Sequence, residues 1–129
     1  MRMSYMKQLK VIQGDITQFQ GDAIVNAAKY IIHTPGPIWR GGYSGEPQLL
    51  ANSYQNSLRL ADRYGCQTVA FPSISTGVYA YPLGKAAAIA VQTIQKFMVK
   101  ARNIREVTMV CFDTKTFQAY QDQVEHRLP

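Results

Sequence analysis

The chain has few charged residues, few cysteines and no long apolar run, and each shortage excludes a class of protein. Charged residues make up only 17% of the 129 residues, which argues against long disordered segments. Cys66 and Cys111 are too few for a disulfide framework, so we expect reduced, buried thiols in a cytoplasmic protein. No apolar run approaches the length of a membrane span, and residues 1–6 lack the apolar core of a signal peptide.

Metal ligands and reactive groups are also scarce. Neither His33 nor His126 has a second ligand at metal-binding spacing, so we expect no metal and no cofactor. The two thiols lack a nearby histidine and a nucleophile motif, so thiol catalysis is not expected.

What is present fits one packed domain over residues 1–129. Apolar residues make up 47% of the chain, which is enough for a single core. Fourteen lysines and arginines against eight acidic residues leave a net charge of +6. This balance favours anionic partners such as phosphates, nucleotides or nucleic acid.

Strand-like and helix-like segments alternate along the sequence. The expected strands are residues 7–13, 22–28, 29–34, 68–74 and 106–112, and the expected helices are residues 47–64, 82–101 and 114–128. This order predicts an α/β fold with a mostly parallel sheet, right-handed crossovers and helices on both faces. Ligands of such sheets bind at the carboxyl ends of strands. Three loops should therefore share one rim: residues 14–17, 75–81 and 112–114.

The loop at residues 75–81 carries the clearest chemical signal. It connects a buried strand to a helix, so its backbone N–H groups and the helix N-terminus favour a phosphate or pyrophosphate. Gly77 lets the backbone approach an anion closely, and Ser75 and Thr76 add hydroxyl donors. A Walker lysine is missing, which excludes a nucleoside-triphosphate P-loop. An ordinary strand-to-helix turn explains the same residues about equally well.

Other polar residues have both a functional and a structural interpretation. Asp15, at the end of the first expected strand, suits an exocyclic amine such as that of adenine, but Asp–x–Thr is also a turn pattern. Asn26 interrupts an apolar run and needs a partner from the backbone or from a ligand. A basic stretch at the end of the second expected helix suits the helix dipole; it contains Lys96, Lys100, Arg102 and Arg105. Nucleic-acid binding is the disfavoured alternative, because interleaved aromatic residues are missing.

Together these segments resemble the macrodomain, the ADP-ribose-binding module. The resemblance rests on residues 14–17, 22–28, 32–37 and 110–113, and most specifically on Ile-Ser-Thr-Gly-Val-Tyr-Ala-Tyr-Pro at residues 74–82. Within the family the chain is most similar to the bacterial branch that deacetylates O-acetyl-ADP-ribose and removes mono-ADP-ribose from acidic side chains. The resemblance implies a three-layer fold in which helices flank a central mixed sheet.

The resemblance also implies roles for individual residues at the adenine end of the ligand. Asp15 would hold the adenine amino group, with help from the Ile16 backbone. Phe112 would pack against the adenine ring.

Further roles concern the phosphates and the reacting bond. The pyrophosphate would lie on a cradle made by Ser75, Thr76, Gly77 and Val78. Tyr79 would lie near the distal ribose, and Asn26 would match the first asparagine of the family's Asn-Ala-Ala-Asn motif. These last two are the candidate catalytic residues.

The sequence departs from the family pattern after Ala28. Lys29 replaces the second asparagine, and the following Gly-rich loop, its aspartate, one helix and one strand are absent. In the family's hydrolases this block orients the attacking water, and losing a general base costs ~10²–10⁴-fold in rate. We therefore expect an ADP-ribose-binding module with hydrolysis weakened or lost. The alternatives are an active deacetylase or hydrolase, a remnant that binds nothing, and a basic nucleic-acid binder.

The shortening also leaves the expected strands at residues 22–28 and 29–34 with nothing between them. A parallel crossover needs a dozen or more residues. The segment would then form either one long strand or a strand-exchanged homodimer, in which residues 31–34 pair with another subunit. We favour the homodimer, because a shortened hinge promotes strand exchange.

Overall fold

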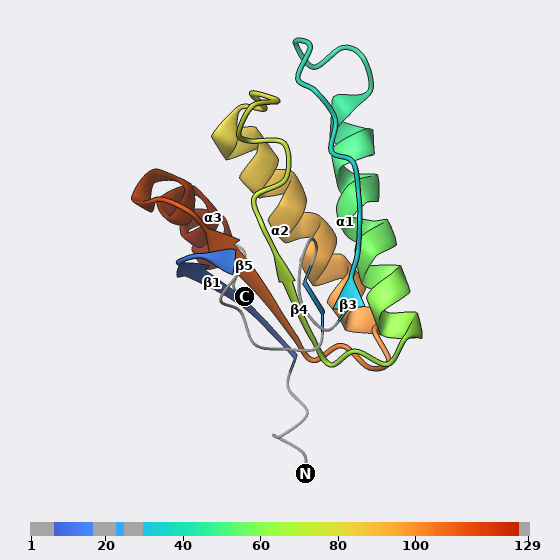
Figure 1. Ribbon diagram of the computed structural model, residues 1–129. Coiled ribbons are helices and arrows are strands. Elements are labelled where there is room, and N and C mark those ends of the chain that lie inside the picture. Colours follow the sequence, from blue (N-terminus) through green and yellow to red (C-terminus); the bar gives the residue numbers. More distant parts are fainter. Residues whose placement is uncertain (1–6, 17–22, 25–29, 127–129) are drawn as a thin grey trace.

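The computed structural model describes residues 7–16, 23–24 and 30–126, and it confirms the expected alternation of strands and helices (Figure 1). The elements follow in the order β1 (Gln8–Gln13), β2 (Ala23–Ile24), β3 (Tyr30–Ile31), α1 (Glu46–Arg63), β4 (Thr68–Phe71), α2 (Leu83–Lys100), β5 (Glu106–Cys111) and α3 (Thr114–His126). The three expected helices are confirmed, with ends that differ by one or two residues.

The strands form one sheet in the order β1-β5-β4-β2-β3, and all four pairings are parallel. The sheet was expected to be mixed, but its described strands are parallel throughout. Parallel strands have their carboxyl ends at one edge. The loops that follow β1, β4 and β5 therefore emerge on the same side of the molecule.

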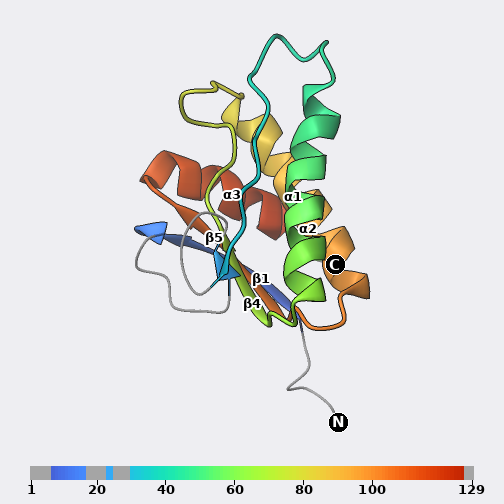
Figure 2. The ribbon, with the colours of Figure 1, turned by 45° about the vertical axis from the view of Figure 1, so that its right-hand side comes forward.

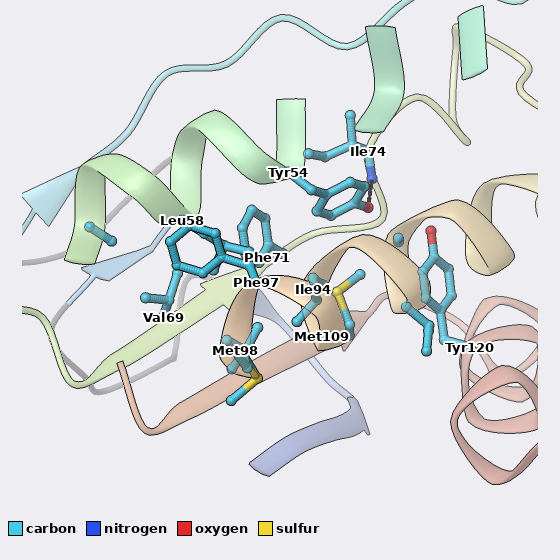
Figure 3. Close-up of a cluster of buried hydrophobic side chains, with 14 of the residues drawn as sticks. Tyr54, Leu58, Val69, Phe71, Ile74, Ile94, Phe97, Met98, Met109 and Tyr120 are labelled. Atoms are coloured by element: carbon cyan, nitrogen blue, oxygen red, sulfur yellow. Dashed lines mark hydrogen bonds between the residues drawn. The ribbon is translucent and has the colours of Figure 1, made fainter. Parts of the chain in front are cut away.

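All three described helices lie on one face of the sheet (Figure 2). Alternate residues of β4 and β5 point to that face, and they share one core with the helices (Figure 3): Val69, Phe71, Val107 and Met109. Helices on both faces were expected, and the described part of the chain does not have them. The crossovers β3–α1–β4 and β4–α2–β5 both advance toward β1, and right-handed crossovers in one direction place their helices on one face.

The helices form where apolar residues recur at three- and four-residue spacing. Pro47 lies in the first turn of α1, where a missing N–H costs nothing. The buried positions of α2 form a stripe between its neighbours: Ala86, Ala87, Ala90, Val91, Ile94, Phe97 and Met98. The carboxylate of Asp113 caps the start of α3 by accepting the Thr116 N–H at 2.8 Å.

The pairing of β2 with β3 corrects the expected topology. Ala23 and Ile24 pair in parallel with Tyr30 and Ile31 of the same chain, so these residues form two short strands and not one long strand. The rule of a dozen residues applies to crossovers between full-length strands. Each strand here has two residues, and the five residues between them span up to about 17 Å, enough to return so short a distance. The topological reason for a strand-exchanged dimer is thereby removed.

A carboxylate fixes the edge of the sheet at which the strands begin. Asp62, near the end of α1, accepts the backbone N–H groups of Arg102, Asn103 and Ile104 at 3.0, 2.7 and 2.9 Å. Burial alone would raise the pKa of Asp62, but these hydrogen bonds outweigh it and lower the pKa below 3.8. The charged side chain thus holds the turn that connects α2 to β5.

None of the described helices is both long and apolar enough to cross a membrane. Cys66 and Cys111 are buried, as expected from the sequence, and neither forms a disulfide. Burial raises the pKa of Cys111 to about 11, with a contribution from the charge of Asp113. This thiol therefore stays protonated and unreactive near neutral pH.

The core around Leu58 makes a first prediction. Leu58 is fully buried between helices and sheet, whereas Leu60, two residues further along α1, is 37% exposed. We expect Leu58→Ala to lower the free energy of unfolding by about 2–5 kcal/mol through lost burial and an internal cavity. The matched control Leu60→Ala should cost less than about 1 kcal/mol. Equal losses in urea denaturation would contradict this packing.

The hydrogen bonds of the Asp62 carboxylate lead to a second prediction, on how stability depends on pH. Because folding lowers the pKa of Asp62, its contribution to stability is present above about pH 4 and is lost as the pH falls through the folded-state pKa. Asp62→Asn should therefore be less stable than the wild type at neutral pH, and the two should converge in acid. Urea denaturation between about pH 7 and pH 3 measures both. A constant difference across that range would show that the carboxylate charge is not responsible.

Candidate functional site

A cleft of about 320 Å³ lies at the edge where the strands end. It is lined by Gly14, Asp15, Ile16, Pro72, Ser73, Thr76, Gly77, Val110, Phe112, Asp113 and Thr116. Residues following β1, β4 and β5 all contribute, so the three expected loops do share one rim. Five of the predicted ligand residues line this single cleft: Asp15, Ile16, Thr76, Gly77 and Phe112.

The other predicted site residues lie elsewhere. Val78 and Tyr79 are at the tip of the 75–81 loop, with 98% and 42% of their surface exposed. Ser75 turns inward: in the described part of the chain, its Oγ is a buried side-chain atom without a hydrogen-bond partner. Asn26, the other candidate catalytic residue, lies outside the described residues.

The 75–81 loop has an unusual, tightly closed backbone. The N–H of Tyr81 donates to the Ser75 carbonyl and that of Ala80 to the Gly77 carbonyl, both at 2.9 Å. Ser75 and Ala80 have φ values of 68° and 59°, in the left-handed region that side chains disfavour. Such strain persists only where the surroundings impose it, and it is concentrated at functional sites.

Gly36 is one source of that constraint. A Cβ at this position would collide with Ser75 Oγ and with the Ile74 side chain, so only glycine fits. The segment that leads from β3 to α1 therefore packs directly against the beginning of the 75–81 loop.

Side-chain hydroxyl groups from two helices and from the strand end support the beginning of the 75–81 loop. Thr76 Oγ1 and the Tyr120 hydroxyl lie 2.7 and 2.5 Å from Ser73 Oγ, and the Tyr54 hydroxyl accepts the Ile74 N–H at 3.1 Å (Figure 3). Burial raises the pKa of Tyr120 to about 12 and that of Tyr54 well above 10. Both hydroxyls therefore stay protonated, and they hold the loop as neutral hydrogen-bonding groups.

Both tyrosines lie in helices that the sequence predicts, at residues 47–64 and 114–128, but neither was predicted to support this loop. Their hydroxyl groups were the available signal, because a buried phenol needs a polar partner. The sequence does not say that this partner is the strand-end loop.

Phe112 stands at the other side of the cleft. Its side chain is 87% exposed, although the residue directly follows the buried strand β5. Asp113 beside it is occupied by capping α3: its hydrogen bonds to Thr116 lower the pKa of the carboxyl. The cleft is thus lined by the exposed ring of Phe112 and by Asp15, which carries a carboxylate. The 75–81 loop adds Thr76, which carries a hydroxyl, and Gly77.

Glu46 is the feature that sequence reasoning missed. Its carboxylate is 1% exposed and accepts the backbone N–H groups of Arg40, Gly42 and Ser44 at 2.6, 3.0 and 2.7 Å. Burial alone would raise the pKa of Glu46, but the hydrogen bonds outweigh it and lower the pKa to about 2. The signal in the sequence was an acid at the start of a helix, directly after the glycine-rich stretch Arg40-Gly-Gly-Tyr-Ser-Gly45.

A larger recess, of about 600 Å³, lies between α1 and α2. It is lined by Pro47, Gln48, Ala51, Gln55, Ile89, Gln92, Thr93, Lys96, Phe97 and Lys100. None of the predicted ligand residues borders it, and helix surfaces form its walls. The smaller cleft at the strand ends has the polar groups and loop backbone that a phosphate-bearing ligand needs.

Comparison with proteins of known sequence places this site in a family context. The Macro domain family matches residues 2–90 of the chain. A Macro domain-containing protein from Lactiplantibacillus plantarum is 42% identical over 159 aligned residues, which cover 86% of this chain and 92% of that protein. An O-acetyl-ADP-ribose deacetylase from Cronobacter turicensis is 50% identical over 95 residues, which cover 74% of this chain but only 54% of that protein. The chain thus spans about half the length of this second relative.

Solved structures agree with the sequence comparison. The Oceanobacillus iheyensis macrodomain with MES bound superposes with a TM-score of 0.85 at 30% identity, covering 93% of this chain and 92% of that chain. A mutant of the same macrodomain with ADPR gives a TM-score of 0.66 at 41% identity, covering 70% and 48%. The fold is a macrodomain fold, and the expected resemblance is confirmed. Because the family match extends over most of its residues, the chain belongs to the macro domain family.

Proposed function

We propose that this chain binds ADP-ribose or a derivative of it in the cleft at the strand ends, with hydrolytic activity weakened or lost. The observation that carries the proposal is that one cleft joins Asp15, Thr76, Gly77 and Phe112, from three separate loops. Two similar proteins support it: the O-acetyl-ADP-ribose deacetylase from Cronobacter turicensis, and the Oceanobacillus iheyensis macrodomain mutant solved with ADPR.

Phe112 and Asp15 suit the adenine end. An exposed phenylalanine ring offers a flat apolar face, and stacking of a base on an aromatic side chain stabilises by about 1–3 kcal/mol. Asp15 lines the same cleft, and its carboxylate provides an acceptor for the adenine amino group. A purine bound between these two residues would cover the exposed ring of Phe112.

The 75–81 loop suits the pyrophosphate. Thr76 and Gly77 line the cleft, and α2 begins at Leu83, so the positive end of its dipole lies behind the loop. The Ser75 hydroxyl is turned inward, so we assign Ser75 and Val78 to the cradle through their backbone and not through their side chains. The net charge of +6 favours the approach of such an anion.

Loss of hydrolysis follows from an internal shortening of the chain. The alignment with the L. plantarum protein extends over 159 positions, which is more than the 129 residues of this chain. That protein therefore has residues that this chain lacks. We place the shortening after Ala28, where only five residues separate β2 from β3. A strand-exchanged dimer is not needed for this function, because β2 and β3 pair within the chain.

The second candidate function is an active deacetylase or ADP-ribosyl hydrolase. The name of the C. turicensis relative favours it, and Tyr79 stays at the loop tip with part of its ring accessible. Asn26 would then contribute from the segment between β2 and β3. Without the water-orienting block, general-base catalysis is expected to fall by ~10²–10⁴-fold.

Calorimetry with ADP-ribose tests the binding proposal. We expect the wild type to bind and Phe112→Ala to weaken binding by about 1–3 kcal/mol, because the stacking face is lost. Asp15→Ala should weaken it about tenfold or more, because a hydrogen bond to a charged group is lost. The matched control is Val99→Ala, which truncates an equally exposed side chain on α2 and should leave binding unchanged.

Several outcomes contradict the proposal. No binding by the wild type would remove both the binding and the hydrolase interpretations and leave a non-binding remnant. Binding that is indifferent to Asp15→Ala would overturn the adenine assignment. Strong RNA binding with a steep salt dependence would favour the nucleic-acid alternative.

A turnover assay separates binding from catalysis. We expect the wild type to release acetate from O-acetyl-ADP-ribose no faster than the Tyr79→Phe variant, because the residues that orient the water are absent. Acetate release followed by NMR measures this directly. Turnover by the wild type that is lost in Tyr79→Phe would instead establish the active hydrolase.

A further inference from the structure

The segment between β3 and α1 is organised around a single buried charge. Both oxygens of Glu46 are used: Oε2 accepts the N–H groups of Arg40 and Gly42, and Oε1 accepts that of Ser44. Glu46 is also the first residue of α1, where the helix dipole stabilises a negative charge. The backbone of residues 40–44 therefore forms an anion-binding nest whose anion belongs to the protein itself.

Glycines make this wrapping possible. Gly41, Gly42 and Gly45 have φ values of 93°, 90° and 80°, which other residues rarely adopt. A Cβ on Gly42 would also lie 2.9 Å from the Trp39 ring. The turn is therefore closed tightly against Trp39, and the carboxylate sets where that residue lies.

Trp39 connects this turn to the loop of the proposed ligand site. The backbone N–H of Trp39 donates to the Tyr79 carbonyl at 2.9 Å. The Trp39 ring packs on the Tyr81 ring, with the two ring centroids 4.7 Å apart. Tyr81 in turn closes the 75–81 loop through its N–H to the Ser75 carbonyl. A path of contacts therefore runs from the Glu46 carboxylate to the 75–81 loop, of which Thr76 and Gly77 line the cleft.

We propose that Glu46 is a positioning residue for the 75–81 loop: its carboxylate fixes residues 38–45, and Trp39 transmits that position to the loop. The strained φ values of Ser75 and Ala80 need such external support, since an isolated loop would relax away from them. Glu46 itself does not line the cleft and would not touch the ligand. This inference deepens the proposed function, and its ligand measurement rests on that function.

The test variant is Glu46→Gln, which keeps the size of the side chain. An amide has one acceptor oxygen and a nitrogen that only donates. One set of backbone N–H groups, either that of Ser44 or those of Arg40 and Gly42, would then face a donor and lose its partner.

The structure offers a matched control in Asp62→Asn. Asp62 also accepts three backbone N–H groups, but it lies at the other end of α1, a helix of 18 residues and about 27 Å (Figure 1). Both variants replace a carboxylate that accepts three backbone N–H groups by an amide of equal size. Only Glu46 binds the turn that is connected through Trp39 to the 75–81 loop.

Hydrogen exchange of single amides, followed by NMR without ligand, reads the loop directly. In Glu46→Gln the amides of Trp39, Ala80 and Tyr81 should exchange about tenfold faster or more, while that of Met109 in β5 keeps its wild-type rate. In Asp62→Asn the three loop amides should keep their rates, and those of Asn103 and Ile104 should exchange faster. Unchanged loop amides in folded Glu46→Gln would overturn the proposal.

Calorimetry with ADP-ribose then connects the loop to the ligand. Affinity is measured on folded protein, so a loss of global stability alone does not change it. We expect Glu46→Gln to bind about tenfold more weakly or worse, because a misplaced cradle loses oriented contacts, and Asp62→Asn to bind as the wild type does. Faster loop exchange with unchanged affinity would show that Glu46 holds the loop without positioning it for the ligand.

Two further outcomes are distinguishable. If the wild type does not bind ADP-ribose, the proposed function fails, and hydrogen exchange alone decides the role of Glu46. If Glu46→Gln does not fold, Gly42→Ala replaces it. That variant keeps the carboxylate but displaces the Trp39 ring, and should speed exchange at the same three amides. Wild-type rates there would overturn the proposal.

Discussion

The parallel pairing of β1, β5 and β4 is the constraint on which the site depends. Parallel strands that start together also end together, so strands whose ends lie 40 to 98 residues apart in the chain lead into loops at one edge. Asp15, Thr76 and Phe112 line one cleft for this reason, and not because of any attraction among themselves. Their placement is stabilised by the core beneath them, where the strands pack on three helices.

Hydrogen-bonded carboxylates complete this scaffold at both ends of α1. A parallel sheet leaves irregular turns at each edge, and their backbone N–H groups need acceptors. Glu46 and Asp62 each satisfy three of them with one side chain. In both, hydrogen bonds overcome the cost of burial and favour the charged form of the carboxyl. The two ends differ in what they hold: one fixes a turn that contacts the 75–81 loop, the other a turn at the amino end of β5.

Much of this arrangement could be predicted from the sequence, because it follows from local patterns. Helical spacing in residues 47–64 and 82–101, and the turn residues after each strand, predicted the elements and the shared rim. What the sequence did not reveal depends on which groups meet in the folded chain. The glycine-rich stretch before Glu46 does not specify which backbone N–H groups its carboxylate accepts, and nothing near Tyr120 indicates Ser73. The pairing of β2 with β3, and the placement of all described helices on one face, follow from the order of strands in the sheet, which local spacing does not encode.

The proposed separation of binding from hydrolysis has a physical basis in how each property depends on geometry. Stacking on Phe112 tolerates small displacements, because dispersion and burial change gradually with distance. Backbone cradling at residues 76–77 is fixed by the fold beneath it, including the hydroxyl chain that ends at Tyr120. Attack by water instead needs one molecule held within a few tenths of an ångström of its target, and a misplacement of about 1 Å costs on the order of 10²-fold. Under the proposed function, a macro domain shortened in this way can keep its ligand while losing its reaction, because the proposed binding contacts lie in the described core and the contacts that would orient water lie in the segment proposed to be shortened.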